Sequence, residues 1–140
     1  MPRSKLSDVG KAASTALRFR LPAVPLSVRQ ARRYVRAYLG FAPAVAGQVE
    51  LALSEAVANA VTHAYPGGEG EIEVVMRLRR DRVEVVVRDQ GVGPVAQRDI
   101  GGRSFGLLLM RGLSDRLEIR GVPGKGTTVR MKFALAGSSV

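Results

Sequence analysis

Two short runs of alternating apolar and polar residues limit most strongly what this chain can fold into. They are separated by Arg80 and Asp81. The alternating apolar positions are Ile72, Val74, Met76 and Leu78 in the first run and Val83, Val85 and Val87 in the second. A period of two places these side chains on one face of a strand. We therefore predict a hairpin of antiparallel strands at residues 71–79 and 82–88.

Three more strands are predicted at residues 19–24, 116–120 and 127–134, and three helices at 27–39, 43–64 and 105–113. Pro22 and Pro25 limit the pairing of the first strand, which favours a sheet edge. Ser27 and Gln30 fit a capping box at the first helix, and Gly40 follows its predicted end. The second helix is expected to contribute core contacts from Leu51, Leu53, Ala56, Val57, Ala60 and Val61.

This order of elements predicts a two-layer α/β (α+β) sandwich. Helices would cover one face of a mixed, mostly antiparallel sheet. The tight turns between strands argue against a doubly wound parallel sheet. A length of 140 residues fits one domain. We expect the domain at residues 17–136, with a basic flexible tail at 1–16 and a short tail at 137–140.

Positive charge is concentrated in the first 40 residues. The net charge is +10, and residues 1–40 hold nine Lys or Arg and one Asp. Part of this charge recurs at helical spacing at Arg29, Arg32, Arg33 and Arg36. We predict that this face contacts an acidic partner, and the alternative is a solvated helix face. A nucleic-acid-binding protein is a further alternative, but no helix-turn-helix or aromatic RNA-binding signature occurs, so direct DNA binding is not expected.

The apolar runs and the cysteine content bear on the compartment. No apolar run is long enough to span a bilayer, and the first residues lack the apolar core of a signal peptide. The chain has no cysteine, which is compatible with a reducing compartment. We therefore expect a cytoplasmic protein that does not bind membranes.

Three polar patches stand out against this framework. Glu55 and Asn59 lie four residues apart on the second predicted helix and therefore share a face. Asp89 has the parity of the buried valines before it, and a carboxylate on a buried face requires a partner. Thr127 has the inward parity of its own strand, and the Gly-rich turn 121–126 precedes it.

Between these patches lies a Gly-rich segment, at residues 91–106. Gly101, Gly102 and Gly106 precede or open the predicted helix 105–113. Free N–H groups at a helix start suit phosphate. No Gly-Lys-Ser/Thr sequence occurs in a P-loop context.

In order and spacing, the three patches resemble the nucleotide pocket shared by DNA gyrase, sensor histidine kinases and heat-shock chaperone ATPases. The short chain narrows the resemblance to the bacterial anti-sigma factor serine/threonine kinases. The resemblance implies a Bergerat-type fold with ATP and Mg²⁺ as cofactors. Glu55 would then be the catalytic group and Asn59 the Mg²⁺ ligand, while Asp89 would bind the adenine amine. The other implied nucleotide-binding residues are Gly91, Gly93, Gly102, Arg103, Gly106, Leu107, Gly126 and Thr127.

The same resemblance implies a homodimeric anti-sigma factor. It would sequester a sigma factor and use ATP to phosphorylate a Ser or Thr of an antagonist protein. The chain departs from the family at Ser104, which stands where the first Gly of a Gly-X-Gly pattern is usual. The alternative is therefore a non-catalytic anti-sigma binding module, with or without ATP.

Overall fold

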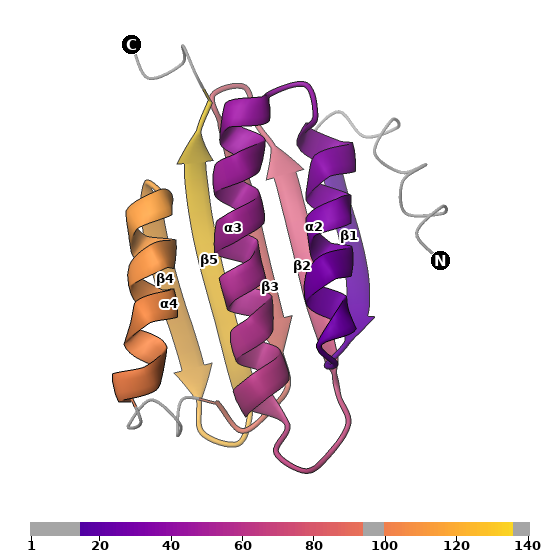
Figure 1. The fold of residues 1–140 in the computed structure, drawn as a ribbon, viewed down its shortest axis with the longest axis vertical. Helices are drawn as coiled ribbons and strands as arrows, with labels where there is room; N and C mark the ends of the chain where they lie inside the picture. Colours follow the sequence, from indigo (N-terminus) through magenta and orange to yellow (C-terminus); the bar gives the residue numbers. More distant parts are fainter. Residues whose placement is uncertain (1–14, 94–99, 136–140) are drawn as a thin grey trace.

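The computed structural model describes residues 15–93 and 100–135 and shows two layers, a sheet with helices on one face (Figure 1). The strands are β1 (Thr15–Pro22), β2 (Glu71–Leu78), β3 (Arg82–Asp89), β4 (Arg116–Val122) and β5 (Gly126–Ala134). The helices are α2 (Leu26–Leu39), α3 (Pro43–Asn59) and α4 (Ile100–Leu113), and a π-helix η1 (Ala60–Ala64) continues α3. The predicted two-layer fold is confirmed.

The sheet has the strand order β1-β2-β3-β5-β4, and every neighbouring pair is antiparallel. The predicted mixture of directions is therefore absent from the described strands. Because β5 lies between β3 and β4, those two strands run parallel to each other and α4 connects them. This crossover brings the end of β3 and the start of β5 into one register.

The alternating pattern of β2 and β3 produces the core as predicted. Val83, Val85 and Val87 are buried against the helices. At the edge strand, Phe19 of β1 stacks on Tyr34 of α2 with ring centroids 3.9 Å apart. Burial of one such large apolar side chain stabilises a fold by roughly 1.5–3 kcal/mol. The sheet is thereby fixed to the helical layer along its length.

The start of the chain differs from the prediction in two ways. β1 forms a sheet edge as expected, but it begins at Thr15, inside the predicted tail, because Leu17 is buried in the core. The capping box is wrong. Ser27 lies within α2, and its hydroxyl donates to the carbonyl of Pro22 at 2.6 Å. Residues 1–14 of the predicted first tail, the predicted tail 137–140 and residue 136 lie outside the described residues.

Two helical predictions also need correction. Leu51 was expected in the core, but it is 37% exposed on α3. α4 begins at Ile100, five residues before the predicted start. Gly101 and Gly102 suggested a loop, yet a helical Gly costs only about 1 kcal/mol relative to Ala. None of the helices within the described ranges is long and apolar enough to cross a bilayer.

Candidate functional site

The predicted site residues gather at one end of the sandwich. The ends of α3 and β3 lie there, together with the starts of α4 and β5, at the lower end of Figure 1. Asn59 ends α3, Asp89 ends β3, and Thr127 is the second residue of β5. The fold therefore brings three separate parts of the sequence to a common edge.

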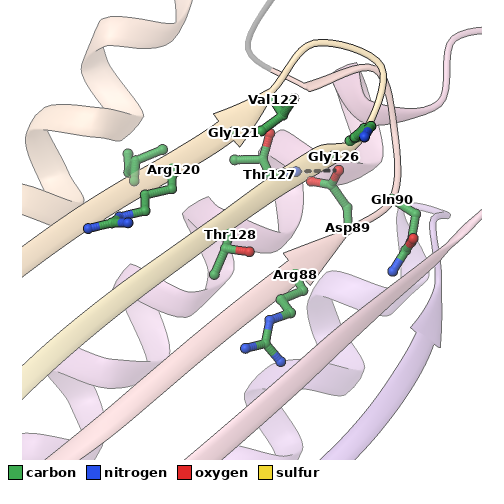
Figure 2. A pocket seen from close by; sticks show the side chains of 11 residues that line it. Arg88, Asp89, Gln90, Arg120, Gly121, Val122, Gly126, Thr127 and Thr128 are labelled. Atoms are coloured by element: carbon green, nitrogen blue, oxygen red, sulfur yellow. Dashed lines mark hydrogen bonds between the residues drawn. The ribbon is translucent and has the colours of Figure 1, made fainter.

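Asp89 is the polar centre of this edge. Its side chain is half-buried, and Oδ1 accepts a hydrogen bond from the backbone N–H of Gly91 at 2.9 Å. Oδ1 also accepts one from the backbone N–H of Thr127 at 3.3 Å (Figure 2). Burial raises the pKa of the Asp89 carboxyl, and the two backbone hydrogen bonds oppose that shift. Within the described residues, Oδ2 accepts no hydrogen bond. The carboxylate is therefore held by one oxygen and can accept a donor at the other.

The glycines around Asp89 are required by close backbone approaches. A Cβ at Gly91 would overlap the carbonyl oxygen of Ala64, and a Cβ at Gly126 would overlap that of Asp89 itself. Gly93 and Gly126 also have positive φ angles, 81° and 99°. Side chains at these positions would strain the backbone. Glycine thus lets three chain segments meet beside the carboxylate.

The π-helix η1 joins the end of α3 to this loop. The carbonyl of Ala64 accepts a hydrogen bond from the N–H of Val92 at 2.8 Å. The helix was predicted to reach residue 64, but its last turn is π-helical directly after Asn59. Single π-helical turns often mark functional sites. Asn59 therefore stands at the irregular turn beside the loop that follows Asp89.

Glu55 and Gly106 are brought together across the α3–α4 contact. A Cβ at Gly106 would lie 2.7 Å from Glu55 Oε1. Glu55 and Asn59 are each half-buried, and Leu107 packs against the core. Gly102 and Arg103 lie in the first turns of α4 instead of a loop. The side chains of residues 100–105 lie outside what the structure describes.

Tyr65 is a site residue that the sequence reasoning missed. Its hydroxyl accepts a hydrogen bond from the N–H of Gln90 and donates one to the carbonyl of Glu71, both at 2.7 Å. This links the residue after Asp89 to the start of β2. Its only sequence signal is an aromatic residue between a helix and the turn Pro66-Gly67-Gly68. Tyr65 supports the backbone that carries Asp89.

The arginines of α2 do not form one uniform patch. Arg36 Nη2 lies 2.6 Å from Glu50 Oε2, and Arg32 Nε lies 3.3 Å from the same oxygen. Glu50 belongs to α3, so these two arginines connect the helices. Arg29 and Arg33 are exposed and make no ion pair within the described residues. Of the four arginines in the predicted partner surface, two are therefore paired with α3 and two are not, within the described residues.

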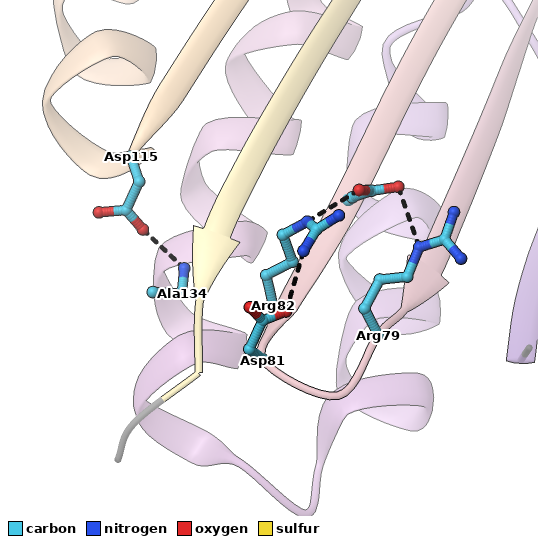
Figure 3. Close-up of polar contacts among 6 residues, drawn as sticks. Arg79, Asp81, Arg82, Asp115 and Ala134 are labelled. Atoms are coloured by element: carbon cyan, nitrogen blue, oxygen red, sulfur yellow. Dashed lines mark hydrogen bonds and ion pairs between the residues drawn. The ribbon is translucent and has the colours of Figure 1, made fainter. Parts of the chain in front are cut away.

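Polar groups at the opposite end of the sheet satisfy one another (Figure 3). Arg82 contacts Asp81 and Glu84, each at 2.9 Å. Asp115 Oδ2 accepts a hydrogen bond from the N–H of Ala134 at 2.6 Å. These polar groups are paired with one another and stabilise the fold, whereas the half-buried Asp89 has an oxygen, Oδ2, that accepts no hydrogen bond within the described residues. The end with Asp89 is therefore the candidate site.

The amino-acid sequence is similar to those of several known bacterial regulatory proteins. A serine-protein kinase RsbW of Bacillus velezensis is 36% identical over an alignment of 110 residues, and the match covers 66% of each chain. An anti-sigma F factor of Clostridium acetobutylicum is 29% identical over 100 residues, 62% of this chain and 70% of that protein. A serine-protein kinase RsbW of Bacillus pumilus is 38% identical over 103 residues, 59% of this chain and 61% of that protein. The chain thus spans less than two thirds of each kinase.

The sequence also matches a family model over most of its length. Residues 21–133 match the histidine kinase-like ATPase domain. The match begins within β1 and ends within β5, so it covers every element that builds the site. The chain therefore belongs to the histidine kinase-like ATPase domain family.

Proposed function

We propose that this protein is an anti-sigma factor with ATP-dependent serine/threonine protein kinase activity. The observation that carries the proposal is the half-buried Asp89, held at Oδ1 by two backbone N–H groups and unoccupied at Oδ2 within the described residues. The family match and the names of the relatives, serine-protein kinase and anti-sigma F factor, support it.

Asp89 selects the nucleotide base in this proposal. Oδ2 accepts a hydrogen bond from the exocyclic amine of adenine, which guanine lacks at that position. Gly91, Gly93 and Gly126 allow the close backbone approaches that hold Asp89 in place, and Thr127 offers a hydroxyl on the same face of the sheet. A charge-assisted bond in a half-buried site contributes about 1.5–3 kcal/mol.

Asn59 and the start of α4 bind the phosphate end. Within the described residues there is no group of three or more Asp, Glu or His side chains that could hold a metal ion. Mg²⁺ takes few protein ligands and keeps waters and phosphate oxygens, so the single amide oxygen of Asn59 fits it. The backbone N–H groups of Gly102 and Arg103, in the first turn of α4, suit phosphate oxygens, whereas Gly106 and Leu107 lie one turn farther along the helix, beside Glu55.

Glu55 is the proposed catalytic base. It lies one helical turn before Asn59 and beside Gly106, so its carboxylate faces the phosphate end without serving as the metal ligand. It accepts the proton of the attacking Ser or Thr hydroxyl while that oxygen bonds to the γ-phosphorus and ADP leaves. A positioned base contributes about 10²–10⁴-fold in rate.

The partners follow from the same proposal. A sigma factor is bound and withheld from RNA polymerase, and an antagonist protein accepts the phosphoryl group. The protein acts in the cytoplasm as a homodimer. The exposed Arg29 and Arg33 on α2 provide a basic surface for an acidic partner face.

Calorimetric titration with ATP and Mg²⁺ tests the nucleotide site. Asp89→Asn presents an amide NH₂ group where an acceptor is needed, so the affinity for ATP should fall about tenfold or more. Asp115→Asn at the opposite end of the sheet is the matched control and should leave affinity unchanged. Equal affinities for wild type and Asp89→Asn would remove Asp89 from the adenine site.

A transfer assay tests the kinase activity separately. Partners recovered by pull-down and identified by mass spectrometry are incubated with the protein and γ-labelled ATP. Label should appear on a Ser or Thr of an antagonist and not on the sigma factor. Tight ATP binding without any transfer would make the protein a non-catalytic anti-sigma module.

A further inference from the structure

We infer that the face of the sheet opposite the helices carries a second anion site, for a small ligand bearing phosphoryl groups. A hollow of about 540 Å³ lies on this face beside the β4–β5 turn, and Figure 2 looks into it. No helix residue lines it. Asp89, Gly126 and Thr127 border both the hollow and the proposed nucleotide site, whereas Arg88, Arg120 and Thr128 alternate with the inward residues of their strands and lie on the open face.

The arrangement of strands places two arginines around one hydroxyl. Arg88, Thr128 and Arg120 occupy directly opposed positions on β3, β5 and β4. Neighbouring strands are about 4.8 Å apart, so the two arginine Cα atoms are separated by about 10 Å. The side chain of Thr128 is shorter than the two arginine side chains on either side of it, and it lines the hollow (Figure 2). An anion above Thr128 is thus within reach of both guanidinium groups.

The existing ion pairs leave these guanidinium groups available. Arg88 Nη1 lies 3.6 Å from Glu73, and Arg120 Nη2 lies 3.3 Å from Glu118. Arg120 is 77% exposed and Arg88 41%. Exposed pairs of this kind contribute little, and each uses only one of the nitrogens of a guanidinium group. A doubly charged phosphoryl group can therefore compete for both arginines.

The surrounding charge favours an anion. Lys125 in the turn adds a third cation to the lining, and Gln90 adds an amide. The carboxylate of Asp89 also borders the hollow, and its Oδ1 accepts hydrogen bonds from the backbone N–H groups of Gly91 and Thr127. Basic side chains continue along the same open face at Arg130, Lys132 and Arg116.

Phosphate suits this site better than a carboxylate. Arginine pairs with phosphate oxygens through two parallel N–H groups, and two arginines with one hydroxyl can satisfy three oxygens. The volume exceeds that of one phosphate and falls in the range of small-ligand sites. Inorganic pyrophosphate is therefore a suitable probe.

The full chain is first saturated with a non-hydrolysable ATP analogue and Mg²⁺. It is then titrated with pyrophosphate in a calorimeter. The analogue fills the proposed nucleotide site, so any remaining binding reports the open face. We expect one binding event, weakened at least about tenfold in Arg88→Gln and in Arg120→Gln. Thr128→Val should weaken it as well while the analogue binds normally.

Arg116→Gln is the matched control, because Arg116 lies on the same face of the same strand but outside the hollow. It should retain pyrophosphate affinity. An equal loss in Arg116→Gln and Arg120→Gln, or no binding to the saturated wild type, would overturn the proposal. If the ATP analogue itself fails to bind while pyrophosphate behaves as expected, the proposed kinase function fails and this site stands.

Discussion

Gly106 of α4 lies against the carboxylate of Glu55 on α3, and a Cβ added there would come within 2.7 Å of Oε1. Gly106→Ala should displace that carboxylate, because its flexible end gives way more easily than the helix backbone. We expect phosphoryl transfer to fall while the unfolding temperature holds or rises. Ala is favoured over Gly in a helix by about 0.5–1 kcal/mol.

Gly112→Ala is the control for this substitution. Gly112 belongs to the same helix, and a Cβ there would meet nothing within 4 Å. It should gain the same helix stability and keep full transfer activity. Similar transfer rates in the two variants would show that the position of Glu55 does not matter to the reaction.

Glu55→Gln and Asn59→Ala should separate catalysis from metal-dependent binding. The Gln side chain keeps the shape of Glu55 but accepts no proton, so transfer should fall about 10²–10⁴-fold at nearly unchanged ATP affinity. Asn59→Ala should lose the Mg²⁺-dependent part of the affinity. Labelled transfer and calorimetry with and without Mg²⁺ measure both effects, and a normal transfer rate in Glu55→Gln would refute the base assignment.

Asp89 should make nucleotide binding sensitive to acid. Burial raises its pKa above 3.8, so the carboxyl takes up a proton at a higher pH than an exposed Asp. Because the raised pKa belongs to the folded state, protonation stabilises the fold as pH falls through it. The same protonation removes the charged acceptor, so ATP affinity should decline over that interval. Titrations at decreasing pH should show this decline in wild type and a flatter profile in Asp89→Asn.

Gly126→Ala should damage the site far more than Gly124→Ala. Both glycines have positive φ angles, so each substitution carries a backbone cost of about 1–2 kcal/mol. Only the Cβ at Gly126 would also overlap the carbonyl of Asp89, whereas Gly124 has open space. Thermal unfolding and ATP affinity of the two variants give the comparison. Equal losses would mean that the close approach to Asp89 is unimportant.

Partner association should depend on Arg29 and Arg33. Reversing them to Glu should slow association at low salt and have less effect at high salt, since exposed charges are screened. Reversing Arg32 and Arg36 would place like charges beside Glu50 and weaken the α2–α3 contact as well. Surface plasmon resonance against the recovered partner distinguishes the pairs, and unchanged on-rates for Arg29 and Arg33 would leave this face to the solvent.

Periodicity predicted the parts of this fold that a buried face determines. Val83, Val85 and Val87 occupy the expected face, and the same parity extends to Asp89 and Thr127, which meet in register. The predicted start of α4 was wrong, because its first turns contain glycines that suggest a loop but are tolerated in a helix. Local sequence could not reveal the contacts of Ser27, Glu50 and Tyr65. Glu50 and Tyr65 contact residues that only the tertiary packing brings close, and Ser27 contacts Pro22 only because the chain turns sharply between β1 and α2.

The insertion of β5 between β3 and β4 has a consequence for folding. Asp89 and Thr127 are 38 residues apart, and their hydrogen bond closes a loop that contains all of α4 and β4. Such long-range pairing is slow, because the entropy of closing the loop is lost before its contacts form. During synthesis the surroundings of Asp89 therefore form only after β5 has left the ribosome, so the proposed nucleotide affinity should arise only once β5 has joined the sheet.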